Sequence, residues 1–190
     1  MPDIFSKSVA IKLKVLGWYQ IIGGAIGVLL TIWLLARTQA VSGLLILLFM
    51  VAFCLYGLSI TAGKKLLGSQ YDTGLKLSII NQMLQVFSFL FLGYGFMYVS
   101  GLVLSGNIKY NVGEDGNGLR MGVDFGLFSK WNFDINSNNR SFLFSMNFLA
   151  VYLLYFIYRL RQRINFEFKQ YQLLETENDA DESNSNDNEL

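Results

Sequence analysis

The sequence predicts an all-α integral membrane protein with four transmembrane helices and a small extracytoplasmic β-hairpin or three-stranded insertion between helices 3 and 4. Two observations lead to this fold class. Hydrophobic residues make up 53% of the 190-residue chain and charged residues only 15%, whereas soluble domains carry about 25% charged residues. Four long windows also contain no Asp, Glu, Lys or Arg, namely residues 15–36, 41–62, 77–104 and 142–158. Because a bilayer core about 30 Å thick needs about 20 apolar helical residues, each such window predicts a membrane-spanning helix.

The first two windows are separated only by residues 37–40, so we expect their helices to form an antiparallel hairpin. The third window, with 28 residues, is longer than the bilayer core and predicts a tilted or protruding helix. The fourth predicts a helix that continues into the cytoplasm, because apolar residues recur beyond it at spacings of three and four. These residues are Leu160, Ile164, Phe168 and Tyr171.

Apolar and polar residues alternate within residues 105–141, as they do in half-exposed β-strands. The alternation runs on both sides of an Asp-Gly turn at residues 113–118 and predicts a hairpin, to which residues 131–135 add a third short strand. The acidic turn residues Glu114 and Asp115 lack the spacing of a calcium-binding loop. We therefore expect a plain turn there and no metal site.

The distribution of charge predicts an orientation. Four crossings place ten of the 15 basic residues on the side of both termini and five on the other side. By the positive-inside rule both termini are then cytoplasmic, and we expect the cytoplasmic (inner) membrane. The C-terminal residues are acidic and nearly free of apolar side chains, which predicts disorder. The chain divides into a basic segment (1–14), transmembrane helices 1–3 (15–104), an extracytoplasmic β-rich loop (105–141), transmembrane helix 4 with a cytoplasmic extension (142–174) and a disordered acidic tail (175–190).

Several kinds of chemistry are excluded by composition. The chain has no His and a single Cys, so it cannot build a His/Cys zinc site, a His-based catalytic triad or an internal disulfide. The four windows contain no Asp, Glu, Lys or Arg, which argues against proton relays and acid–base catalysis at membrane depth. We expect no enzymatic activity, no cofactor, no metal and no nucleic-acid partner.

Neutral polar residues on two of the predicted helices form the candidate site. On the third helix they recur at spacings of three and four, which places them on one face. They are Ser78, Asn81, Gln82, Gln85 and Ser88. On the first helix Gln20 shares a face with small residues, which allow another backbone to approach closely. These helix-packing residues are Gly17, Gly23, Gly24 and Gly27, with Gly23 and Gly27 forming a GxxxG pair. The two faces have two interpretations: interhelical hydrogen bonding, or a neutral polar pocket for a ligand such as a lipid headgroup.

No motif in the chain is specific enough to indicate a family. The first functional hypothesis is a non-enzymatic accessory or scaffold subunit of a membrane assembly. The alternative is a carrier, pore or lipid-binding protein that uses the polar face between helices 1 and 3. The expected partners are the lipid bilayer, a protein that contacts residues 105–141 or the C-terminal segment, and further copies of the chain in a homo-oligomer.

Overall fold

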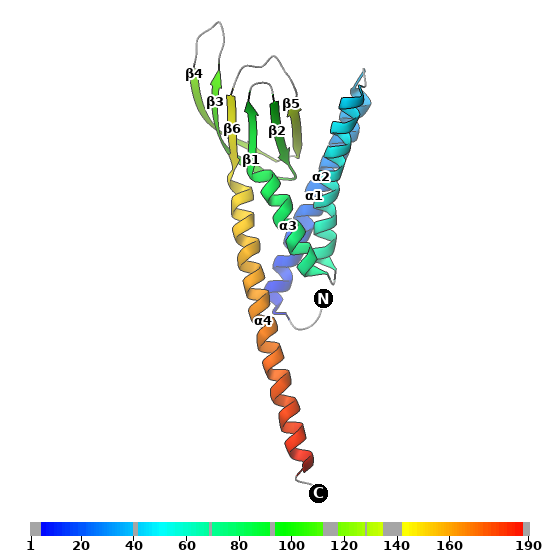
Figure 1. Cartoon of the computed structure of the whole chain (residues 1–190), viewed down its shortest axis with the longest axis vertical. Coiled ribbons are helices and arrows are strands. Elements are labelled where there is room, and N and C mark those ends of the chain that lie inside the picture. The colour runs from blue at the N-terminus through cyan, green and yellow to red at the C-terminus, as the bar shows by residue number, and fades with distance from the viewer. Residues whose placement is uncertain are drawn as a thin grey trace.

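The computed structural model describes residues 5–39, 42–68, 70–91, 94–111, 118–127, 129–134 and 142–187. In these ranges the chain forms four helices and one six-stranded antiparallel sheet (Figure 1). The helices are α1 (Lys7–Arg37), α2 (Gly43–Leu67), α3 (Tyr71–Val86) and α4 (Phe148–Asp187). The strands are β1 (Phe87–Phe91), β2 (Tyr94–Val99), β3 (Val103–Asn111), β4 (Gly118–Gly126), β5 (Lys130–Asp134) and β6 (Phe142–Asn147).

The predicted all-α fold is therefore wrong, and the chain is neither a four-helix bundle nor a four-span, multi-pass helical protein. Within the described ranges only α1 and α2 are long and apolar enough to cross a membrane. The third predicted span, residues 77–104, contains the end of α3, then β1, β2 and the start of β3, and the fourth, residues 142–158, begins as β6. An uncharged window does not by itself distinguish a helix from a strand. Aromatic residues at every second position, such as Phe87, Phe89 and Phe91, favour a strand here.

The strands follow the order β4-β3-β6-β1-β2-β5, and every neighbouring pair is antiparallel. Three of them, β3, β4 and β5, come largely from residues 105–141, where the sequence predicts a small separate insertion. They instead share one sheet with strands from the windows predicted to be helical spans. The predicted turn at residues 113–118 lies outside the described ranges except for Gly118.

The strand register gives the sheet one apolar face and one polar face. On the apolar face Phe89 lies beside Phe96 and Phe144 of the neighbouring strands. On the polar face, residues from all six strands line one cavity of about 20 Å³, which has room for about one water molecule. Both edge strands contribute to this cavity, through Asp124 of β4 and Lys130 of β5. The sheet therefore curls toward its polar face.

The predicted antiparallel hairpin of α1 and α2 is present, and it forms the most extensive contact between any two described elements. Glycines bring the two backbones together. A Cβ atom on Gly63 would lie 2.5 Å from the carbonyl oxygen of Gly17, and one on Gly24 would lie 2.9 Å from that of Tyr56. Larger residues at these positions would separate the helices.

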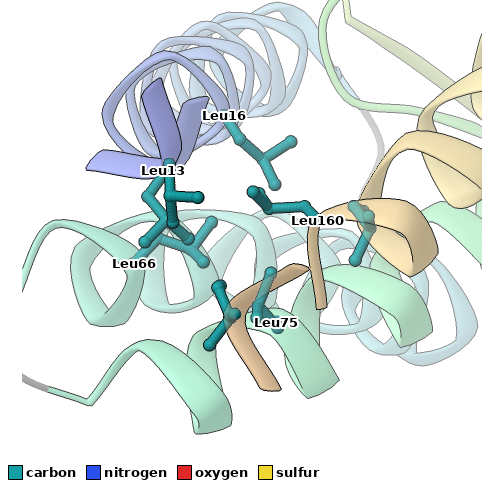
Figure 2. Close-up of a cluster of buried hydrophobic side chains, with 8 residues drawn as sticks. Leu13, Leu16, Leu66, Leu75 and Leu160 are labelled. Carbon is teal, nitrogen blue, oxygen red and sulfur yellow. The ribbon is translucent and has the colours of Figure 1, made fainter. Parts of the chain in front are cut away.

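The four helices meet in a leucine-rich core formed by the start of α1, the end of α2, the start of α3 and residues 157–164 of α4. Figure 2 shows Leu13 and Leu16 of α1 lying close to Leu66, Leu75 and Leu160, which come from α2, α3 and α4. All five side chains are at most 3% exposed. Since burying one leucine side chain contributes about 1.5–3 kcal/mol, this cluster holds the C-terminal helix against the other three.

Helix α4 follows β6 directly, and Asn147 caps it. The Oδ1 atom of Asn147 accepts hydrogen bonds from the backbone N–H groups of Leu149 (3.1 Å) and Ala150 (3.3 Å). The helix then continues through residues 175–187, where the sequence predicts disorder. Extending an existing helix needs no new nucleus, so a polar segment can continue a helix that it would not start. The last three residues lie outside the described ranges.

A carboxylate on α4 holds the start of α1. Ser6 caps α1 by accepting a hydrogen bond from the N–H of Val9, while its own N–H and hydroxyl donate to the carboxylate of Glu167 at 2.9 and 2.8 Å. Arg163 donates to the same carboxylate at 3.2 Å. Partial burial raises the pKa of the Glu167 carboxyl, but the hydrogen bonds from Ser6 and Arg163 outweigh this effect. The pKa therefore lies below its usual value of 4.5.

We predict that Glu167→Gln removes a pH-dependent part of the stability. Because the pKa of Glu167 is lowered in the folded state, its carboxylate stabilises the fold fully above pH 4.5. This contribution is lost as the pH falls through the lowered pKa. In thermal unfolding in detergent, Glu167→Gln should show a lower midpoint at pH 7 and a shallower decline toward acid than the wild-type protein. Glu175→Gln, at an exposed position farther along α4, is the matched control and should follow the wild-type profile. A Glu167→Gln profile that overlays the wild type would contradict the prediction.

Candidate functional site

The polar residues that the sequence predicts on one helical face are buried where the helices meet the sheet. Gln20 of α1 and four residues of α3 are each at most 1% exposed, the four being Ser78, Asn81, Gln82 and Gln85. Ser88, at the end of the predicted polar face, instead lies on β1 and lines the cavity on the polar side of the sheet. A hydrogen-bonded set, here named the junction network, consists of Gln20, Ser59, Ser78, Asn81, Gln85, Tyr98, Ser100 and Ser129.

Helices α1 and α3 meet through Gln20 and Ser78. The Oγ atom of Ser78 lies 3.1 Å from Oε1 of Gln20 and 2.6 Å from the carbonyl oxygen of Gly74. A hydroxyl carries one proton, so Ser78 donates to the nearer oxygen, that of Gly74. Reversing the Gln20 side-chain amide, whose oxygen and nitrogen are interchangeable in shape, lets its NH₂ group donate to Ser78. The predicted polar faces of the two helices are thus brought into contact.

Ser59 of α2 lies at the centre of the junction network. Its Oγ atom accepts hydrogen bonds from Nδ2 of Asn81 at 3.2 Å and from the hydroxyl of Ser100 at 3.0 Å. The same hydroxyl donates to the backbone carbonyl of Gln20 at 3.0 Å. One serine therefore uses its full hydrogen-bonding capacity and connects α1, α2, α3 and the segment that follows β2.

The segment between β2 and β3 is bound to the helices through its backbone. The N–H of Ser100 donates to Oε1 of Gln85 at 2.9 Å. The N–H of Gly101 donates to the hydroxyl of Ser129 at 2.9 Å, and that hydroxyl donates to the carbonyl of Gly23 at 2.6 Å. Gly101 has a φ of 102°, a left-handed conformation that glycine adopts without a steric cost.

Two buried tyrosines join α2 to β2. The hydroxyl of Tyr98 lies 2.8 Å from the carbonyl oxygen of Leu55 and 3.0 Å from Oδ1 of Asn81. The hydroxyl of Tyr56 donates to the carbonyl of Val99 at 3.3 Å. The two rings pack with their centroids 5.3 Å apart, and both residues are completely buried. This contact fixes the base of the sheet against the middle of the helical hairpin.

Both glycines of the GxxxG pair in α1 pack against other parts of the same chain. A Cβ atom on Gly23 would lie 2.9 Å from the backbone nitrogen of Gly101, and one on Gly27 would overlap the ring of Tyr56. Gly17 packs against α2. The small residues predicted on this face therefore allow the sheet connection and the second helix to approach α1 closely.

Some amide atoms at the junction have no hydrogen-bond partner among the described residues. They are Nε2 of Gln85, both Oε1 and Nε2 of Gln82, and the amide atom of Gln20 that does not face Ser78. A buried polar group without a partner costs about 1–3 kcal/mol. Gln82, which is 1% exposed, therefore presents a free donor and a free acceptor in the interior. Such a group can bind water or a neutral polar ligand.

Four members of the junction network are missing from the sequence prediction, namely Ser59, Tyr98, Ser100 and Ser129. Ser59 had a usable signal, because it is one of few polar residues in an otherwise apolar window. Tyr98 and Ser100 lie in the window predicted as a helical span, where their positions relative to α2 and α3 do not follow from spacing.

The side chains of the junction network carry no charge. The network consists of amides, aliphatic hydroxyls and one phenol, and it contains no carboxylate, amine or thiol. Among the residues that the structure describes, no group of three or more His, Cys, Asp or Glu side chains could hold a metal ion. The arrangement can bind hydrogen-bonding groups, but it offers no acid–base pair for catalysis.

No family model matches this chain. Among curated proteins and among solved structures there is likewise no match. A function must therefore be inferred from the geometry and chemistry of these residues alone.

We predict that Gly27→Ala destabilises the protein by about 1–3 kcal/mol, because the added methyl group must displace the buried ring of Tyr56. The matched control is Gly57→Ala in α2, where an added Cβ meets nothing within 4 Å. That change should be neutral or should stabilise the helix by about 0.5–1 kcal/mol. Chemical denaturation in detergent measures both. Equal effects of the two substitutions would show that Tyr56 and Gly27 are not in contact.

We predict that replacing Asn81 or Gln82, two neighbouring polar residues of α3, by Leu changes the stability in different ways. Asn81→Leu removes hydrogen bonds to Ser59 and Tyr98 and should cost about 1–3 kcal/mol. Gln82→Leu removes an amide without a partner among the described residues and should be neutral or stabilising. Unfolding midpoints of the two purified variants provide the comparison. A loss with Gln82→Leu as large as with Asn81→Leu would mean that the Gln82 amide is paired in the folded protein.

Proposed function

We propose that this chain is a non-enzymatic scaffold subunit embedded in a membrane, in which lipid covers the apolar face of the sheet and the outer surface of the α1–α2 hairpin. The observation that supports this most strongly is the exposed apolar face of the sheet. It spans five strands, and thirteen large apolar side chains on it are each 38–74% exposed. These are Phe87, Phe89, Phe91, Tyr94, Leu104, Ile108, Tyr110, Leu119, Met121, Val123, Phe125, Phe142 and Phe144.

An apolar surface of this kind is unfavourable in water. The largest apolar patch of a soluble monomer usually covers about 300–600 Å². Here the apolar residues of neighbouring strands are in register, so that Ile108 lies between Met121 and Phe144. The polar residues of the sheet point to the opposite, concave face. A sheet with apolar residues outside and polar residues inside is suited to lipid, provided that its backbone groups are paired.

The helical hairpin has a matching surface. Leu29 of α1 is 66% exposed and Met50 of α2 is 59% exposed, and both helices are long enough to cross a bilayer. Lys64 and Lys65 lie in the last turn of α2. This turn, the start of α1 and the described end of α4 all lie toward the end away from the sheet (Figure 1). The positive-inside rule supports a cytoplasmic position for this end, in the inner membrane.

The scaffold assignment is supported by the chemistry of the interior. The junction network fixes the sheet on the helices, and its residues are neutral. A rigid joint between two lipid-facing layers is what a structural subunit requires. The exposed strands and the long C-terminal helix leave surfaces that a protein partner can contact.

Gln82 favours a second candidate function, a carrier, pore or lipid-binding protein. Its amide oxygen and nitrogen are buried without a partner among the described residues. A neutral polar ligand would supply both hydrogen bonds. For this candidate, Gln82→Leu would abolish the function of the protein in cells while the purified protein kept its stability.

The membrane placement predicts a two-residue alternation of environment along β3. Ile108 lies on the apolar face and Lys109 on the polar face. In a Cys54→Ser background, Ile108→Cys should react slowly with a water-soluble maleimide in native membranes. A spectroscopic label there should be quenched by lipids with a nitroxide on the acyl chain. Lys109→Cys should show the reverse, and Glu175→Cys on the exposed part of α4 is the aqueous reference.

The decisive readout is the contrast between the two neighbouring positions. Equal maleimide reactivity at 108 and 109 would reject a lipid-covered sheet. Release of the wild-type protein from membranes by alkaline carbonate, without detergent, would reject the membrane placement as a whole.

A further inference from the structure

Strand β4 is an open edge of the sheet. Its nine residues pair with β3 on one side only, so every second residue directs its N–H and C=O groups away from the sheet. The side chains of Leu119, Met121, Val123 and Phe125 are 64–74% exposed. The other edge strand, β5, is shorter and rests on the helical hairpin, where Trp131 packs against Phe49 and donates to Thr31. β4 is therefore the edge available to another strand.

A long unpaired edge is a pairing site in any solvent. In water it recruits other strands, and in lipid an unpaired backbone group has no water to bond with and is strongly unfavourable. In the described part of the chain, no element pairs with the outer side of β4. A second strand alongside β4 satisfies these groups.

The sequence of β4 is complementary to itself. It reads Gly-Leu-Arg-Met-Gly-Val-Asp-Phe-Gly from residue 118 to residue 126. When two copies align antiparallel with Gly122 opposite Gly122, Met121 lies opposite Val123 and Leu119 opposite Phe125 on the apolar face. Gly118 then lies opposite Gly126. Every pair joins residues of the same face, as an extended sheet requires.

The charges of β4 match in this alignment. On the polar face Arg120 of each copy lies opposite Asp124 of the other, which gives two ion pairs by symmetry. Within the described chain Arg120 takes part in none of the ion pairs. Asp124 accepts one hydrogen bond, from Asn107 at 2.6 Å to Oδ2, which leaves Oδ1 for the arginine. Opposite charges across a strand pair stabilise it, and like charges destabilise it.

We propose that two copies of this chain associate through β4, antiparallel about a two-fold axis at Gly122, so that their sheets join into one. The contact is isologous, so it closes after two copies and forms no open fibre. The apolar faces of the two sheets become continuous, and so do the polar faces. Pairing through the β4 edge does not depend on which solvent covers the apolar face.

Cysteine cross-linking of the full-length protein tests the register. In a Cys54→Ser background, Gly122→Cys should form a disulfide-linked dimer on mild oxidation, because position 122 faces itself. Gly118→Cys should not, since the two copies of position 118 would be about 27 Å apart along the strands. Both positions are open to an added Cβ. No cross-link at position 122, or equal cross-linking at position 118, would overturn the proposal and leave the membrane placement intact.

Charge exchange tests the recognition. Arg120→Asp and Asp124→Arg should each weaken self-association about tenfold or more, since each variant places like charges opposite one another twice. Mixing the two variants restores both ion pairs, so mixed dimers should form at wild-type affinity, measured by energy transfer between labelled chains. Lys169→Asp, at an exposed position on α4 far from the sheet, is the control and should leave the dimer unchanged. Failure of the mixture to recover, or a wild-type protein that is monomeric or bound only to a different protein, would overturn the proposal.

Discussion

The position of the sheet depends on the hydrogen bonds made by two residues after β2. The backbone N–H groups of Ser100 and Gly101 are buried, and they donate to side chains. Buried backbone donors must be paired, and here the acceptors are Gln85 of α3 and Ser129, which is itself bonded to α1. Hydrogen bonds in an apolar interior are stronger than in water, and losing one is correspondingly costly. The joint between the two halves of the molecule is therefore small but specific.

Parts of this architecture follow from the sequence because they depend on local spacing. The four-residue link between two apolar windows allows only a tight return, and α1 and α2 form that hairpin. The amides of α3 recur at helical spacing as far as Gln85, and the helix does extend to Val86. The contact of this face with Gln20, made by Ser78, could be predicted because both segments are helical there.

The sheet could not be predicted by the same reasoning. Counting uncharged residues measures the preference of a segment for an apolar solvent, and a strand with aromatic side chains satisfies that count as well as a helix does. The distinguishing signal is the period of two at Phe87, Phe89 and Phe91, and again at Phe142 and Phe144. The pairing of these segments with one another is a long-range property that single-chain spacing does not contain. The role of Ser129 in the junction network could not be predicted for the same reason, because its partners Gly23 and Gly101 lie far away in the chain.

The direct passage from β6 into α4 fixes the longest helix to the sheet. No loop separates the strand from the helix, and the cap at Asn147 anchors the first turn. The leucine-rich core and the hydrogen bonds of Glu167 to Ser6 hold α4 against the other helices as far as residue 167. The remaining 20 residues of the helix project for about 30 Å at about 1.5 Å per residue. A protein bound to this projecting part would therefore be held at a fixed distance and orientation relative to the sheet.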